Sequence, residues 1–150
     1  MRFKSAADKI YHEYFLPYRE HEYGFLLQLA LKKGYRFCRH CDYEVLNSAA
    51  SDDKLFFLRH DIDTDVSIAR RMFTEEKKLG IKSTYYFRRC TLDVNFAREL
   101  HAFGSEVGYH YEEIADYAKQ HGIGSREEIQ NHMDEIQRNF LLNLVEMRGK

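Results

Sequence analysis

The feature that most constrains the fold of this chain is an alternation of strand-like and helix-like segments in its central part. Three segments are apolar or rich in β-branched and aromatic residues, and the two between them have apolar residues at helical spacing. The expected strands are 54–61, 81–89 and 105–113, and the expected helices are 65–80 and 95–104. Strands separated by helices usually pair in parallel, so the sequence predicts an α/β fold with a parallel sheet.

The helix expected at 65–80 has the clearest boundaries. Thr64 or Asp65 can cap its first turn, and Gly80 can end it. Its apolar stripe consists of Ile68, Ala69, Met72, Phe73 and Leu79. This spacing is typical of an amphipathic helix that packs on a sheet.

The segments on either side of this core are also expected to be mainly helical. Apolar residues at helical spacing predict a helix at 19–34, followed by a short extended segment and a turn. A last helix is expected at 125–144, with an apolar face of Ile129, Met133, Ile136, Phe140 and Leu144. The 150 residues contain no internal repeat and one proline, so we expect a single domain: a lead-in at 1–53, a βαβαβ core at 54–113 and the C-terminal helix.

Composition excludes some classes of protein. Charged residues make up 31% of the chain and the mean hydropathy is -0.61, which excludes an integral membrane protein. The net charge of -1 gives no electrostatic reason to expect a nucleic acid or an anionic membrane as partner. The first residues lack an apolar stretch of secretory length, and three cysteines are an odd number, so we expect a cytoplasmic protein with reduced thiols.

A cluster of ionisable residues follows the apolar segment KLFFL, in the sequence LRHDIDTD at 58–65. If the strand continues, Arg59, Asp61 and Asp63 point to one side of the sheet, and His60 points to the other. Burying unpaired charges is costly, so we expect these residues at the open end of the strand, paired or holding a ligand.

The last expected strand places two further polar residues at the same edge. His110 and Glu112 share one side of the segment SEVGYHYEE at 105–113. In a parallel sheet both strands end at the same edge, so Asp61 and Asp63 are expected near them. Carboxylates and an imidazole are ligands for a divalent metal. The alternative is that Asp63 and Asp65 only cap the next helix, Arg59 pairs with Asp61, and His110 is a hydrogen-bonded residue at the strand end.

The segments FLRHDIDTDVSIARRMFTEEKKLGIKSTYYF and LHAFGSEVGYHYEE resemble the polysaccharide deacetylase (NodB-homology) family, in its branch with an Arg-His-Asp-x-Asp first motif. The resemblance covers about residues 55–113. It implies a distorted (β/α) barrel and a divalent metal, in most cases zinc, that serves to remove acetyl groups from N-acetylated carbohydrates. Such a hydrolase would act on C–N bonds other than peptide bonds, in polysaccharide biosynthesis or modification.

The resemblance also implies roles for individual residues. Asp61 matches the general base, which Arg59 is expected to hold in its charged form, and His110 matches a metal-binding histidine. Ile62 stands where the family has a second metal-binding aspartate, so Asp63 is the expected substitute. Ile114 stands where the family has its second histidine. We expect Glu112 as the third ligand, with Glu113, His60 or a residue outside this chain as alternatives.

The expected core amounts to roughly half of such a barrel, since only a loop and a helix are expected after residue 113. Two alternatives to an active deacetylase follow: an inactive module of the same fold that binds sugar or supports assembly, or a fragment of a longer enzyme. An incomplete sheet would leave an edge for a second copy of the chain, or for the C-terminal helix, to cover.

Three other motifs have weaker support. The segment DIDTD approaches the Asp-x-Asp-x-Thr of haloacid-dehalogenase-type phosphatases, but Asp65 replaces the threonine. A calcium-binding loop is excluded because Val66 and Met72 stand where a glycine and a bidentate glutamate are needed. Cys38 and Cys41 have the spacing of a zinc knuckle, yet a structural zinc needs four ligands, so we expect free thiols there.

Overall fold

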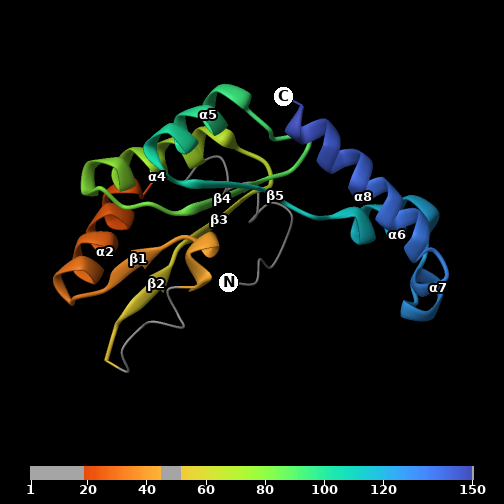
Figure 1. Ribbon diagram of the computed structural model, residues 1–150, viewed down its shortest axis with the longest axis horizontal. Coiled ribbons are helices and arrows are strands. Elements are labelled where there is room, and N and C mark those ends of the chain that lie inside the picture. Colours follow the sequence, from red (N-terminus) through yellow and green to blue (C-terminus); the bar gives the residue numbers. More distant parts are fainter. Residues whose placement is uncertain (1–18, 45–51, 150) are drawn as a thin grey trace.

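The computed structural model describes residues 19–44 and 52–149. It confirms an α/β fold in which short parallel strands alternate with helices (Figure 1). The elements of the core are β2 (Leu55–Phe57), β3 (Arg59–Ile62), α4 (Val66–Leu79), β4 (Thr84–Phe87), α5 (Val94–Phe103) and β5 (Glu106–Tyr109). They are preceded by α2 (Glu20–Lys32), β1 (Arg36–Cys38) and η1 (His40–Glu44), and followed by α6 (Glu113–His121), α7 (Arg126–Gln130) and α8 (Met133–Arg148).

Strands β3, β4 and β5 form one parallel sheet, with β4 in the centre. Its register places Asp61 beside Tyr86, and Tyr86 beside Gly108. Strand β2 pairs instead with β1 in a second parallel sheet. The single strand expected from residue 54 onward is therefore two strands that meet at Leu58, because its two halves have different partners.

Helices α4 and α5 cover one face of the three-stranded sheet. Asp65 caps α4 by accepting a hydrogen bond from the backbone N–H of Ser67, and Gly80 ends the helix with a φ of 68°. The buried core between helices and sheet consists of Ile62, Ala69, Phe73, Tyr85, Phe87, Phe96 and Leu100. Apolar burial of this kind is the main stabilising contribution to such a fold.

The opposite face of this sheet is polar. By strand alternation Arg59, Asp61, Tyr86 and Gly108 belong to it. The 3-10 helix η1 lies near the amino ends of β4 and β5, where the backbone N–H of His40 donates to Thr84 Oγ1 at 2.9 Å. Further polar side chains, those of Asp63, Arg88 and His110, directly follow the carboxyl ends of β3, β4 and β5.

The C-terminal part of the chain differs from the expectation in two ways. Strand β5 ends at Tyr109, and α6 begins at Glu113, where a loop was expected. The single helix expected at 125–144 is two helices, α7 and α8, separated at Asn131 and His132, and α8 continues to Arg148. Helix α8 packs beside α6 and beyond the end of β5, where Phe140 stacks on Tyr109 with ring centroids 6.0 Å apart.

Helix α2 confirms the helix expected at 19–34, but its buried side is different. The apolar residues at helical spacing that predict this helix are Phe25, Leu26, Leu29 and Ala30. In the structure Gly24 and Leu27 are buried, whereas Phe25 and Leu26 are 63% and 60% exposed. None of the helices in residues 19–44 and 52–149 is long and apolar enough to cross a membrane.

Candidate metal centre

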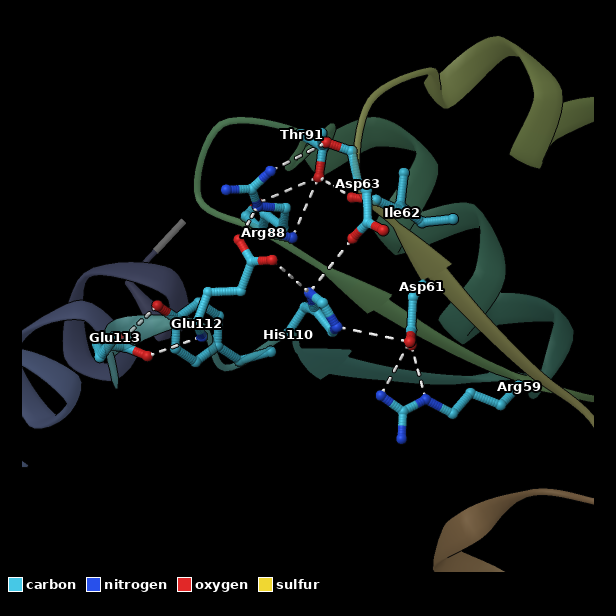
Figure 2. A network of polar contacts seen from close by, with 10 residues as sticks. Arg59, Asp61, Ile62, Asp63, Arg88, Thr91, His110, Glu112 and Glu113 are labelled. Atoms are coloured by element: carbon cyan, nitrogen blue, oxygen red, sulfur yellow. Dashed lines mark hydrogen bonds and ion pairs between the residues drawn. The ribbon is translucent and has the colours of Figure 1, made fainter. Parts of the chain in front are cut away.

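Polar side chains follow the ends of three neighbouring strands and converge at the carboxyl edge of the sheet (Figure 2). Asp61 lies within β3, and Asp63 follows its last residue. Arg88 follows β4 directly, and His110 follows β5. Glu112 lies two residues further on, at the start of α6. Because the strands are parallel, these residues from distant parts of the chain lie at one edge.

His110 is the centre of this group. Its Nδ1 lies 3.4 Å from Asp63 Oδ1 and 3.9 Å from Glu112 Oε1, and its Nε2 lies 3.5 Å from Asp61 Oδ2. The imidazole is only 17% exposed, and Nδ1 is buried without a hydrogen-bond partner among the described residues. Buried polar atoms normally have partners, so this nitrogen needs an explanation.

Asp63, His110 and Glu112 each offer one ligand atom, and these atoms lie within 4.8 Å of one another. The structure thus brings together the three residues that the sequence names as metal ligands. Their role as ligands stays a prediction. The two sequence alternatives for the third ligand lie elsewhere: His60 is on the opposite face of β3, and Glu113 accepts hydrogen bonds from Tyr109 and Asn143.

Asp61 is held by Arg59. The guanidinium donates two hydrogen bonds, from Nε to Oδ1 at 2.6 Å and from Nη2 to Oδ2 at 3.0 Å. Arg59 also lies over the ring of Tyr86, with its Cζ 4.7 Å from the ring centroid. This bidentate pair fixes the orientation of the carboxylate that faces His110.

Tyr86 and Gly108 support this arrangement, although the sequence analysis assigns neither of them a role. Gly108 on β5 lies beside the ring of Tyr86 from β4. A Cβ at position 108 would lie 2.4 Å from Tyr86 Cε1, so only glycine leaves room for this ring. The hydroxyl of Tyr86 lies 3.1 Å from His40 Nδ1 on η1. The Tyr86 ring, over which the Arg59 guanidinium lies, is therefore held by its packing on Gly108 and by the contact of its hydroxyl with His40.

Arg88 is a further charged residue that the sequence analysis missed. Its guanidinium forms an ion pair with Glu112 through Nε and donates from Nη1 to the carbonyl oxygen of Asp63 at 3.4 Å. Arg88 falls inside the strand expected at 81–89, whereas β4 ends at Phe87, so its place at the strand end follows only from the structure.

A cleft of about 490 Å³ opens beside the centre. Its lining includes His110 and Glu112 of the centre, together with residues of α6 and α8 such as Asp116 and Asn143. Cys90 also lines it; Cys38, Cys41 and Cys90 are all free cysteines. A cleft of this volume is within the usual range for small-ligand sites.

Comparison of the chain with protein-family models, with curated proteins and with solved structures finds no match. Its function is therefore inferred from the side chains at the strand ends and from the motifs in its sequence.

Proposed function

We propose that this chain is a metal-dependent hydrolase of the polysaccharide deacetylase type, acting on N-acetylated carbohydrate in polysaccharide biosynthesis or modification. The observation that carries the proposal is the buried Nδ1 of His110, which has no hydrogen-bond partner in the described residues and faces the carboxylates of Asp63 and Glu112. An imidazole nitrogen between two carboxylates is a typical donor set for a divalent cation.

Zinc fits this set of donors best. One nitrogen and two carboxylate oxygens would give three protein ligands, the number found in catalytic zinc sites that keep one position open. A bound zinc ion would polarise the substrate carbonyl and lower the pKa of water at the site.

The other residues have roles that follow from their contacts. Nε2 of His110 lies 3.5 Å from Asp61 Oδ2, and a proton on this nitrogen would leave Nδ1 free to act as a ligand. Asp61, fixed by Arg59, would accept a proton from the attacking water. The water oxygen bonds to the acetyl carbon, the amide C–N bond breaks, and the proton taken up by Asp61 passes to the departing nitrogen, so the products are acetate and a free amine.

The second candidate is an inactive module of the same fold that binds sugar or supports assembly. It is favoured by the ion pairs of Arg59 with Asp61 and of Arg88 with Glu112, which compensate two carboxylates without a metal. In this case the Asp63 and His110 pair would be part of a structural ion cluster.

The two candidates are separated by zinc titration calorimetry and an acetate-release assay on an N-acetylated oligosaccharide. For an active enzyme, wild type binds zinc and releases acetate, while Asp63→Ala and His110→Ala lose about tenfold or more in zinc affinity. His101→Ala is the matched control, because His101 lies on α5, exposed and away from the centre. Equal affinity in all four proteins would exclude the ligand set, and zinc binding without acetate release would leave the inactive module.

We also propose that the protein is cytoplasmic and that it associates with a second copy of itself. Within the described residues β5 is an edge strand, with no further strand beyond it. Light scattering across a concentration series would test this, and a monomer at every concentration would contradict it.

A further inference from the structure

Arg88 has a fixed position in the middle of the candidate centre. It follows the central strand β4, and its backbone N–H donates to Thr91 Oγ1 at 3.1 Å. The same Thr91 hydroxyl donates to the carbonyl oxygen of Ile62 at the end of β3. The backbone of the loop after β4 is thus attached to the neighbouring strand end, and it places the Arg88 guanidinium between Asp63 and Glu112 (Figure 2).

Glu112 has two different neighbours. Its Oε2 is in the ion pair with Arg88, whereas its Oε1 lies 3.9 Å from Nδ1 of His110. The side chain of Glu112 is 28% exposed and that of Arg88 is 29% exposed, so water screens this pair only in part. A divalent cation coordinated by Glu112 would lie a few ångströms from a permanent positive charge.

From this geometry we propose that Arg88 competes with the divalent cation for Glu112. The inference rests on the proposed metal centre and adds its regulation. A cation held through Oε1 of Glu112 is repelled by the guanidinium on Oε2, and coordination by both oxygens requires the guanidinium to leave. Repulsion between like charges at this distance weakens cation binding, so Arg88 raises the cation concentration at which the centre is loaded. The opposite role, in which Arg88 holds Glu112 in the orientation for coordination, predicts weaker binding once the arginine is removed.

Zinc titration calorimetry on wild type, Arg88→Gln and Arg89→Gln distinguishes these roles. We expect Arg88→Gln to bind zinc about tenfold more tightly than wild type, a difference of about 1.4 kcal/mol. Arg89→Gln removes the same charge one residue away, from a side chain that pairs with Glu146 on α8 at 2.8 Å, and should change the affinity less than about twofold. Equal or weaker binding by Arg88→Gln would overturn the competition.

A second measurement follows Arg88 in the wild-type protein and needs a variant only to assign its resonance. In wild type labelled with ¹⁵N-arginine, the Nε–H resonance of Arg88 should shift as zinc is added, because its ion pair with Glu112 is broken. Arg88→Lys, which keeps the charge, assigns the resonance by its absence. Zinc binding without any shift of this resonance would also overturn the competition, whereas the absence of zinc binding in all proteins would exclude the metal centre itself.

Discussion

Glu76 offers the most direct test of how this fold is stabilised. It lies on α4, is fully buried and accepts hydrogen bonds from four side chains. His60 Nε2 lies 2.6 Å and the Tyr85 hydroxyl 2.9 Å from its oxygens, and Ser83 and Tyr23 donate the other two. A buried charge is tolerated only with such partners, so this network connects α4 to α2, β3 and β4.

We predict that Glu76→Ala lowers the free energy of unfolding by about 3–5 kcal/mol, because it leaves a buried imidazole and three hydroxyls without their acceptor. Tyr85→Phe removes one donor and should cost about 1 kcal/mol. The surface variant Glu99→Ala, which loses exposed ion pairs with Lys77 and Arg70, should cost less than about 1 kcal/mol. Urea unfolding at neutral pH measures all three, and a loss of less than about 1 kcal/mol for Glu76→Ala would refute the reasoning.

The same network has a defined dependence on pH. Burial alone would raise the pKa of Glu76, but the hydrogen bond and charge of His60, together with the bonds from Ser83 and Tyr23, lower it below its ordinary value. A carboxyl group with a lowered folded-state pKa contributes stability above its unfolded pKa of about 4.3. This contribution is lost as the pH falls through the folded pKa. The stability difference between wild type and Glu76→Ala should therefore shrink in acid, and an increase would contradict the assignment.

Three further predictions concern the site and its scaffold. Gly108→Ala should lower the free energy of unfolding by about 1–3 kcal/mol in urea titrations, because the new Cβ meets the ring of Tyr86. Asp65→Ala should cost about 1 kcal/mol, since it removes the 2.7 Å hydrogen bond that caps α4 at Ser67, and thermal unfolding would detect this. Arg59→Gln should reduce acetate release about tenfold or more while zinc affinity changes less than about threefold, since Arg59 contacts Asp61 and none of the proposed ligands.

The elements that the sequence predicts well are those with local signals. The helices expected at 65–80 and 95–104 occur as Val66–Leu79 and Val94–Phe103. Both begin at an aspartate whose side chain accepts a backbone hydrogen bond, and both end at a glycine with positive φ. Caps and helical periodicity are properties of a few consecutive residues, so they can be read without knowledge of the tertiary structure.

The features that were missed depend on partners distant in the sequence. The break at Leu58 exists because β2 pairs with β1 while β3 pairs with β4. Helix α6 begins at Glu113 without a side-chain cap, and its buried Tyr117 donates a hydrogen bond to Glu135 on α8 at 2.6 Å. His60 is one of the alternatives for the third ligand in the sequence analysis. In the structure it is buried against Glu76, which is 16 residues away in the sequence, so the residues around His60 do not reveal this contact.

The two faces of β3 show why convergence of charged groups does not by itself indicate a site. On one face His60 meets Glu76, whose oxygens accept four hydrogen bonds, so this carboxylate is fully compensated within the protein. At the strand end beyond the other face, His110 meets three carboxylates, yet its buried Nδ1 has no hydrogen-bond partner in the described residues. A closed network is complete without a ligand, whereas a buried lone pair between carboxylates is stabilised by a cation or a proton. This difference favours a structural role for Glu76 and a ligand-binding role for His110, and zinc titration tests the second directly.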